Sequence, residues 1–440
     1  MKKTCLLFAA LAWLLAAGDF KIGVGSAVIT PFLDTRMAGY YYPRTADGLH
    51  DDLHAKALVF DDGQNQIVLV ACDAVSVRRD AVEEARRRIQ KKWGIPPSHV
   101  LISATHSHTG PVLTEEYGKS LSQWIADSVM TAQGRKKTAT LSAATEQEGS
   151  LPHYRRYFMK DGSVRTNPGF LNPDVVKPAG EIDPTVGVLY AEDDLRQPLL
   201  TWVNYAMHQD TVGGTWISAD YAHFLAQFLS KIKGPEMLTI FTIGAAGNIN
   251  HWDVRRPAPQ RGFETARRLG EVLGSAVAKA CTHLEPLSGL RVRAISEAID
   301  LPLARITPEQ VEQARKVLAQ PPPPNVDFTI ERVQASKVMR VQNRKGQPIR
   351  AEIQALAVGP VAFVGIPGEL FVELGRLIRQ QSPFAYTFVV ELANDGIGYL
   401  PTREAFQQGS YEPTSSPLEP GAGEKIADTA IGLLKRLAAL

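Results

Sequence analysis

Two histidines two residues apart are the first candidates for chemistry in this chain. The stretch ISATHSHTGP (102–111) places His106 and His108 after an apolar run and before Gly-Pro. In extended backbone, residues two apart point the same way, so both rings are expected to face one site. Neutral imidazole is a common zinc ligand, and an H-x-H pair is typical of half a metal site. Two solvated histidines on a surface loop would give the same pattern, so further ligands must decide between the two interpretations.

Other residues that can bind metals or transfer protons also follow apolar runs. They are His208 after NYAM, Asn248 and Asn250 after IFTIGAAG, Glu369 in VGIPGE, and Tyr399 beyond VVELAND. Ligands of open α/β sheets bind at the carboxyl ends of the strands, so parallel strands would bring these side chains to one rim. Imidazole and carboxylate together favour Zn²⁺ with an open position for water.

The elements that would position these residues alternate between short apolar strands and amphipathic helices. Strands are predicted at 66–75, 99–105, 198–208, 237–247, 361–369 and 386–395, and helices at 78–94, 219–234, 263–284 and 370–381. The first two strands and the helix between them form a βαβ unit. The pattern predicts an α/β fold with a mostly parallel central sheet and flanking helices.

Three segments interrupt this alternation. Residues 145–185 are rich in Pro, Gly and Asn and are predicted to form a long ordered loop, while QPPPPNVD (320–327) is a stiff connector. Alternating residues and an Arg-Lys-Gly turn predict a small antiparallel hairpin over 330–358. No clean boundary divides the chain, so residues 19–440 are expected to form one domain with loop insertions.

The first 18 residues, MKKTCLLFAALAWLLAAG, have two lysines, an apolar run and small residues at a plausible cleavage site. They predict a signal peptide (1–18) and a secreted or periplasmic protein. An N-terminal membrane anchor is the alternative, but the apolar run is short for crossing a bilayer. Of the later cysteines, Cys72 and Cys281, both are expected to be thiols rather than a disulfide.

Composition and motifs exclude several classes of protein. The 440 residues are 44% hydrophobic and 21% charged, with a net charge of +2 and no Lys/Arg cluster, so nothing predicts binding to nucleic acid. The sequence has no G-x-S-x-G elbow, Walker loop, H-E-x-x-H or C-x-x-C motif. GVGSAV (23–28) lacks the third glycine of a dinucleotide-binding fingerprint.

Taken together, ISATHSHTGP, NYAMHQD, IPGEL and GYLPTREAFQQGSYE resemble the neutral/alkaline (non-lysosomal) ceramidase family. The similarity runs from about Phe20 to the final helix and concerns the family's catalytic domain only. It implies an α/β domain around a zinc ion that cleaves the amide bond of ceramide.

The resemblance also implies roles for individual residues. The zinc ligands would be His106, His208, Glu369 and Tyr399. His108 would contact the reacting group, Arg155 would orient the substrate, and Asp220 would occupy an acidic position near the site. Arg156, directly beside Arg155, leaves the register of this arginine open.

One departure from the family concerns the nucleophile. Where ceramidases have G-D-V-S-P, this chain reads GNINHW and places Asn250 at the position of the serine. Water activated by zinc can attack an amide directly, and Asn250 could donate a hydrogen bond to the developing oxyanion. His108 would then transfer the proton, because imidazole titrates near neutral pH.

The sequence therefore predicts an exported zinc-dependent amidohydrolase that acts on a small-molecule or lipid-like amide, with peripheral membrane contact for a lipid. Two alternatives stay open. One is a zinc hydrolase of a different amide or an ester, and the other is a binding protein that is inactive because Asn250 replaces serine. The substrate, the metal's identity and the oligomeric state do not follow from the sequence.

Overall fold

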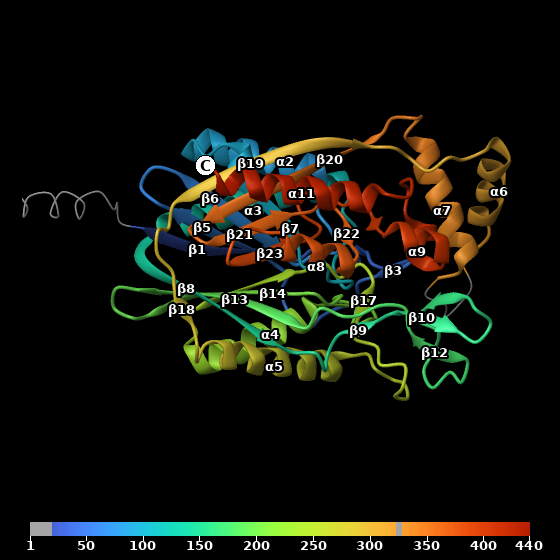
Figure 1. The fold of residues 1–440 in the computed structure, drawn as a ribbon, viewed down its shortest axis with the longest axis horizontal. Coiled ribbons are helices and arrows are strands. Elements are labelled where there is room, and N and C mark those ends of the chain that lie inside the picture. Colours follow the sequence, from blue (N-terminus) through green and yellow to red (C-terminus); the bar gives the residue numbers. More distant parts are fainter. Residues whose placement is uncertain (1–19, 323–327) are drawn as a thin grey trace, which may run out of the picture.

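A curved mixed sheet forms the centre of the fold (Figure 1). The computed structural model describes residues 20–322 and 328–440. Within them this sheet has nine strands, in the order β16, β14, β13, β8, β1, β5, β6, β7, with the short β18 beside β8. Their bounds, in the same order, are Leu238–Ile243, Pro198–Tyr205, Thr185–Asp193, Lys137–Gln147, Lys21–Val28, His54–Asp61, Gln66–Cys72, Val100–Ala104 and Glu285–Pro286.

A second sheet packs inside the curve of the first. Its strands are β19 (Val292–Leu301), β20 (Ile349–Val358), β21 (Val361–Gly365) and β23 (Tyr386–Val390), in that order. The ring of Phe363 in β21 lies 5.4 Å from Trp202 of β14 and 6.3 Å from Phe60 of β5, measured between ring centroids. Because β14 and β5 belong to opposite halves of the large sheet, one apolar core joins both halves to the second sheet.

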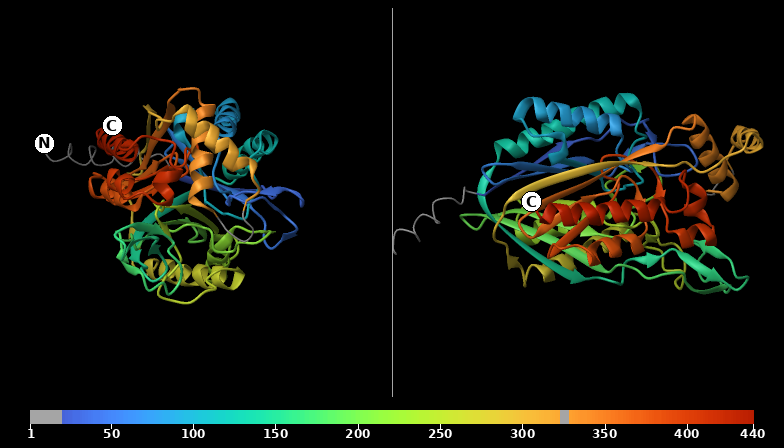
Figure 2. Two further views of the ribbon diagram at one scale, coloured as in Figure 1. Left: turned by 90° about the vertical axis from the view of Figure 1, so that its right-hand side faces the viewer. Right: turned by 45° about the horizontal axis from the view of Figure 1, so that its top comes forward.

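Helices cover the outer faces of both sheets (Figure 2). Helices α2 (Arg79–Trp93) and α3 (Glu115–Gly134) cover one half of the large sheet, and α4 (Asp220–Lys233) and α5 (Phe263–Ala280) cover the other. The second sheet is covered by α8 (Val372–Gln380) and α11 (Ala422–Ala438). The apolar stripe of each helix is therefore buried against a sheet.

The α/β class and its flanking helices are confirmed, but the prediction of a mostly parallel sheet is wrong. The parallel neighbours among the long described strands are β6/β7, β14/β16 and β21/β23. Each pair is joined by a helical crossover, through α2, α4 and α8 respectively. The remaining neighbours in the two sheets are antiparallel. Short turns reverse the chain without a crossover between β5 and β6, β13 and β14, and β20 and β21.

The segment that follows β23 joins the two edges of the large sheet. The backbone N–H of Glu391 donates to Ile243 O at the end of β16 (3.3 Å), and that of Asn394 donates to Ile102 O in β7 (2.7 Å). The side chain of Asn394 also accepts from Ile102 N (3.0 Å) and donates to Gln354 Oε1 (2.8 Å). The carboxyl ends of all three parallel pairs are thereby brought together.

The predicted helices 78–94, 219–234, 263–284 and 370–381 are confirmed as α2, α4, α5 and α8. The hairpin expected over 330–358 is wrong in its first half, because residues Ile330–Asn343 form helix α7. Thr329 caps this helix by accepting from Arg332 N, and Val338 and Val341, about one turn apart, are buried on its inner face. The three-residue spacing of these valines fits the period of a helix and not the alternation of a strand.

Residues 145–185, expected to be a loop, contain short antiparallel strands as well. These are β9 (His153–Tyr154), β10 (Arg156–Met159), β11 (Val164–Thr166) and β12 (Val175–Pro178). The remaining short elements of the described residues are β2 (Arg36–Met37), β3 (Arg44–Thr45), β4 (Gly48–Leu49), η1 (Pro97–His99), β15 (Trp216–Ile217), β17 (Ile249–Asn250), α6 (Pro308–Ala319), β22 (Glu369–Leu370), β24 (Tyr399–Leu400), α9 (Arg403–Gln408) and α10 (Tyr411–Ser415).

Two predicted segments lie wholly or partly outside the described residues: the signal peptide at 1–18 and the connector at 320–327. Among the residues that are described, none of the helices combines the length and the apolar character needed to cross a membrane.

We predict that Asn394→Ala lowers the free energy of unfolding by about 2–4 kcal/mol, measured by urea denaturation. The substitution leaves the buried Ile102 N–H without its side-chain acceptor, and alanine is disfavoured at the observed φ of 65°. Asn343→Ala at the exposed end of α7 is the control, with an expected change below about 0.5 kcal/mol. Equal stability of the two variants would contradict the proposed role of Asn394 in joining the sheet edges.

Candidate metal centre

His106 and His108 follow β7 and converge by a route that differs from the predicted one. His106 has a φ of 74°, so the backbone there is left-handed rather than extended, and the alternation argument for the pair is wrong. The turn is held by a hydrogen bond from His106 N to Ala74 O (2.9 Å). The two rings still meet, with their centroids 4.7 Å apart and their Nε2 atoms 3.3 Å apart.

His208 reaches the same place from the end of β14. Its ring centroid lies 4.5 Å from that of His106, and both residues are almost completely buried. The Nδ1 of His208 lies 2.9 Å from Ala246 O, and the Nδ1 of His106 lies 2.7 Å from Val75 O. A carbonyl oxygen only accepts, so each Nδ1 carries the proton and each Nε2 keeps its lone pair for another partner.

Glu369 supplies an oxygen to these two nitrogens. Its Oε2 lies 3.5 Å from Nε2 of His106 and 3.4 Å from Nε2 of His208. Strands β22 and β24 run parallel and pair Glu369 with Tyr399. Burial and the negative charge of Glu369 both raise the pKa of the Tyr399 phenol, so the two groups act on each other. The structure thus brings together all four residues that the resemblance marks as zinc ligands.

The donor set fits a zinc ion. Tetrahedral zinc with bonds of about 2.1 Å separates neighbouring ligand atoms by about 3.4 Å, close to the separations of Glu369 Oε2 from both Nε2 atoms. This Oε2 is buried and has no hydrogen-bond partner among the described residues. A buried carboxylate oxygen that faces two imidazole lone pairs is unfavourable unless a cation lies between them. The ring nitrogens of His106, His108 and His208 also form a compact group that could hold a metal ion.

The electrostatics keep the ligands in the forms that bind metal. Burial, with a smaller effect of His208, lowers the pKa of His106 to about 4, so its ring is neutral at neutral pH. Burial alone would raise the pKa of Glu369, but contacts with His208 and His106 outweigh it and lower the value to about 2. Burial also lowers the pKa of His108 well below its usual range. No proton therefore needs to leave these groups before a cation binds near neutral pH.

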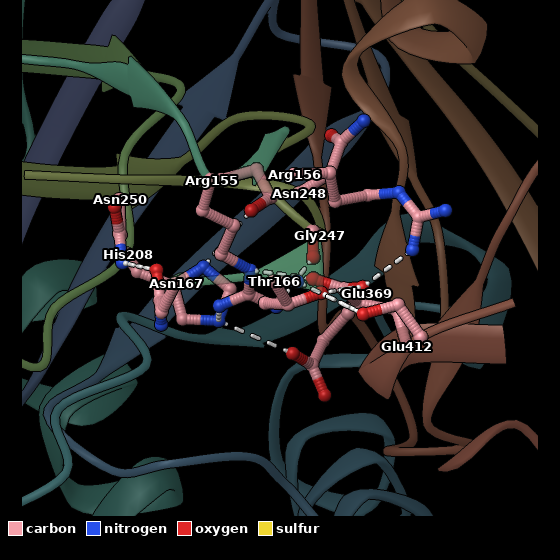
Figure 3. A network of polar contacts seen from close by, with 12 residues as sticks. Arg155, Arg156, Thr166, Asn167, His208, Gly247, Asn248, Asn250, Glu369 and Glu412 are labelled. Atoms are coloured by element: carbon pink, nitrogen blue, oxygen red, sulfur yellow. Dashed lines mark hydrogen bonds and ion pairs between the residues drawn. The ribbon is translucent and has the colours of Figure 1, made fainter. Parts of the chain in front are cut away.

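Arg155, and not Arg156, points toward His208 (Figure 3). Its Nη1 lies 3.2 Å from His208 Nε2, and its Nη2 donates to Gly247 O (2.6 Å). Arg156 is fully buried and donates to Gly409 O (3.0 Å), away from the metal-binding groups. The resemblance matched Arg155, rather than its neighbour Arg156, to the arginine that orients the substrate. The positions of the two side chains agree with that choice.

Glu412 holds both arginines and was not identified from the sequence. Its Oε1 accepts from Arg155 Nε (2.9 Å) and its Oε2 from Arg156 Nη1 (2.8 Å) and Thr166 Oγ1 (2.8 Å). The side chain is fully buried. Glu412 is the last residue of GYLPTREAFQQGSYE, one of the segments that carry the resemblance. That segment does not show that this glutamate pairs with the two arginines.

Asp220 and Asn250 lie near the centre but have structural partners. Oδ2 of Asp220 accepts from the backbone N–H groups of Thr211 and Val212 and fixes the loop that follows His208. Burial raises the pKa of Asp220 to about 6. The amide of Asn250 donates to Asn167 Oδ1 (3.0 Å) and accepts from Trp252 N (3.1 Å). A role of Asn250 as an oxyanion donor stays a prediction.

A cavity of about 220 Å³ opens beside the candidate metal centre. Its described lining consists of Gly39, Tyr40, Tyr41, His108, Arg155, Asn167, Asp210, Trp252, Arg261, Phe328, Tyr399 and Tyr411. Three of the residues predicted for the site, His108, Arg155 and Tyr399, therefore face the space in which a substrate would bind.

A second group of metal-capable side chains lies elsewhere, at His50, Asp51 and His223. Asp51 already accepts from Ser218 Oγ (2.6 Å) and Ala219 N (2.8 Å), and its Oδ2 lies 2.7 Å from His50 Nδ1. Hydrogen bonds account for this group without a cation. His223, on helix α4, contributes its Nδ1 at 3.5 Å from Oδ1 of Asp51.

The fold and the cluster of donors define a mixed α/β protein with a candidate metal centre, and comparisons with known proteins assign the fold. The family model for the N-terminal part of neutral/alkaline non-lysosomal ceramidases matches residues 20–128. Neutral ceramidase A of Dictyostelium discoideum is 33% identical over 105 residues, which cover 22% of this chain and 15% of that protein.

Solved structures extend the likeness to almost the whole chain. The neutral ceramidase of Pseudomonas aeruginosa superposes with a TM-score of 0.76 at 19% identity, covering 95% of this chain and 75% of that one. A ceramidase complexed with C2 gives a TM-score of 0.74 at 18% identity, covering 95% and 76%. The chain has the fold of the neutral ceramidases, and its resemblance to that family is confirmed.

We predict that His106→Ala reduces bound metal from about one ion per chain to a small fraction, measured by elemental analysis of the purified protein. The substitution removes the nitrogen that faces both His208 and Glu369. His283→Ala is the matched control, because this ring is exposed, lies 3.3 Å from Thr145 O and is not among the grouped metal-capable side chains, so the metal content should be unchanged. Retention of stoichiometric metal by His106→Ala would refute the assignment.

Proposed function

We propose that the chain is an exported zinc-dependent hydrolase that cleaves the amide bond of an N-acyl compound, as ceramidases do. The observation that carries the proposal is the convergence of two histidine Nε2 atoms and an unpartnered glutamate oxygen beside a cavity. The ceramidase fold and the family match over residues 20–128 support an amide as the bond that is cleaved.

His106, His208 and Glu369 would hold the zinc ion, with Tyr399 beside them as the fourth ligand. When bound, zinc supplies Lewis acidity that polarises a carbonyl group and lowers the pKa of water. The phenol of Tyr399 is buried, and burial raises its pKa well above the usual value. Until the metal binds, Tyr399 therefore stays protonated and is a hydrogen-bond donor to the cavity.

His108 is the residue best placed to transfer protons. It lines the cavity, and its Nδ1 has no hydrogen-bond partner among the described residues. Because burial lowers the pKa of its ring, the resting form is neutral and first acts as a base. The proton that His108 accepts can then be donated to the leaving amine.

Arg155 would hold the carbonyl oxygen of the substrate. Burial alone would lower the pKa of its guanidinium, but Tyr399 and Glu412 outweigh burial and raise it, so the group stays cationic. Its contacts with Glu412 and Gly247 O fix the plane of the guanidinium before substrate binds. A fixed cation beside the carbonyl stabilises negative charge that develops on the oxygen in the transition state.

The nucleophile in this proposal is water, because Asn250 stands where ceramidases have serine and its amide is held by Asn167 and Trp252. The same replacement favours the alternative that the chain binds a ligand without cleaving it. The complete set of metal-binding groups and the cavity-facing His108 favour the enzyme.

We predict that His108→Ala lowers kcat by about 10²–10⁴-fold while the metal content is retained, because proton transfer is lost. The measurement uses fluorogenic N-acyl substrates with and without a chelator, and the wild type should lose activity when the metal is removed. His283→Ala serves as the control with unchanged kcat. Unchanged turnover by His108→Ala would contradict its role, and metal-loaded wild type that hydrolyses no amide or ester would favour the binding protein.

We also predict that a bacterial host exports the protein and removes residues 1–18. Mass spectrometry of the exported chain should find an N-terminus near Asp19. A membrane-bound chain that keeps its first residue would instead support the N-terminal anchor.

A further inference from the structure

Glu391 is a buried carboxyl group that the proposed mechanism does not use. It directly follows β23 and is 0% exposed. Its Oε2 accepts from the backbone N–H of Leu370 (2.9 Å) and from that of Ala246 (3.2 Å), while its Oε1 has no hydrogen-bond partner within the described part of the chain. Carboxyl groups are rarely buried completely, because burial removes their hydration, so the two hydrogen bonds are the feature that accounts for this one.

The two N–H groups belong to opposite sides of the candidate metal centre. Leu370 directly follows Glu369 in β22, so one hydrogen bond fixes the backbone that carries the metal-binding carboxylate. Ala246 lies in the loop after β16, and its carbonyl oxygen lies 2.9 Å from Nδ1 of His208. The second hydrogen bond therefore fixes the residue that orients a metal-binding imidazole. One oxygen atom thus joins two segments that are far apart in the sequence.

Gly247 shows how closely these two segments pack. Its N–H donates to Leu370 O (2.9 Å), and a Cβ atom at this position would lie 2.5 Å from Glu369 O. The carbonyl oxygen of Gly247 accepts from Nη2 of Arg155 (2.6 Å). Because backbone meets backbone here with no room for a side chain, a shift of either segment would displace Glu369 relative to His208 and Arg155.

Backbone hydrogen bonds hold Glu391 itself in place. Its N–H donates to Ile243 O at the end of β16 (3.3 Å). The N–H of the next residue, Leu392, donates to Gly368 O just before β22 (3.3 Å). The main chain on both sides of the carboxyl group is therefore anchored to the same two segments that the side chain joins. A side chain whose backbone is fixed in this way can impose a position on its partners with little further loss of conformational entropy.

Glu391 can make both hydrogen bonds without carrying a charge. Burial and, to a smaller extent, the negative charge of Glu369 raise the pKa of Glu391 well above its usual range, which favours the uncharged acid. Because Oε2 accepts the two hydrogen bonds, the proton of this acid belongs on Oε1. A glutamine side chain has the same shape, with a carbonyl oxygen and an NH2 group at the corresponding positions.

We propose that Glu391 is a positioning residue of the candidate metal centre. Its Oε2 joins the loop that orients His208 to the strand that carries Glu369, and so sets the separation of the two metal-binding side chains. The inference rests on the proposed zinc-dependent function and adds a residue that touches neither the metal nor the substrate. Residues that orient metal ligands in this way contribute measurably to metal affinity.

The test measures the Kd for Zn²⁺ of variants at position 391 by competition with a chromophoric chelator. Glu391→Leu removes both hydrogen bonds at a similar side-chain size and should raise this Kd by about 10–100-fold. Glu391→Gln keeps an oxygen in place of Oε2 and should hold the Kd within about threefold of the wild type. If Glu391→Leu does not fold, Glu391→Asp, which is one methylene group shorter, should still raise the Kd by about 10-fold. A folded Glu391→Leu or Glu391→Asp variant with the wild-type Kd would overturn the inference.

Gln354→Leu separates positioning from a general loss of stability. Gln354 is equally buried, and its Nε2 donates to Ser98 O (2.7 Å) while its Oε1 accepts from Asn394 Nδ2 (2.8 Å), so it joins other segments than those of the metal centre. Both leucine variants should unfold at a lower urea concentration than the wild type, but Gln354→Leu should keep the wild-type Kd for Zn²⁺. Equal weakening of Zn²⁺ binding by the two substitutions would overturn the inference.

Hydrogen exchange keeps the inference separate from the proposed function, because it needs neither metal nor turnover. In the metal-free protein, peptides that cover residues 244–250 and 366–372 should exchange about 10-fold faster in Glu391→Leu than in the wild type and in Glu391→Gln. Faster exchange together with weaker Zn²⁺ binding supports the inference even if the wild type hydrolyses no amide. Unchanged exchange in both peptides would overturn the inference while leaving an active zinc hydrolase intact.

Discussion

The structure depends on holding three electron-rich groups against one another in a buried place. The Nε2 atoms of His106 and His208 and the Oε2 of Glu369 converge at separations of 3.4–3.5 Å from oxygen to nitrogen. Lone pairs at such distances repel unless a cation lies between them. The guanidinium of Arg155, 3.2 Å from Nε2 of His208, offsets part of this repulsion, and the surrounding protein supplies the remaining restraint. Backbone carbonyls fix the Nδ1 side of each ring, and adjacent parallel strands align Glu369 with Tyr399. A site held in this way is ready for a metal ion and needs little rearrangement to bind one.

The architecture explains how ligands that are distant in the chain meet. The large sheet curves until its β7 and β16 edges are joined by the residues after β23, and each parallel pair has its carboxyl end at that junction. The candidate site therefore lies at strand carboxyl ends, where α/β sheets generally bind ligands, although this sheet is largely antiparallel. Local strain accompanies this arrangement, since His106, Asn167 and Asp220 all have positive φ. Strained backbone persists where the surrounding contacts determine it, and functional sites are common places for it.

The cavity differs in character from the core that surrounds it. The core between the two sheets is built from aliphatic residues and rings such as Trp202 and Phe363, while the described cavity wall combines aromatic rings with His, Asp and Arg side chains. Asn250 is the position at which the chemistry would part from that of a serine-containing ceramidase. His108 belongs both to the group of metal-capable histidines and to the cavity wall, and Asp210 in the wall follows His208 by two residues, so the wall and the candidate centre share loops.

The sequence by itself determined helices α2, α4, α5 and α8, the strands of the three βαβ units and the residues of the candidate metal centre, because hydrophobic period and chemical type are local properties. It did not predict helix α3, and it predicted a hairpin where helix α7 forms. It missed strands β1, β5, β8 and β13 and the antiparallel pairing that follows from them, since pairing partners are set by contacts between distant segments. The direction of the His106 ring, the choice of Arg155 over Arg156 and the role of Glu412 were decided only in the tertiary structure. A backbone turn, a buried ion pair and an orphaned oxygen are properties of neighbours in space, and no spacing along the chain encodes them.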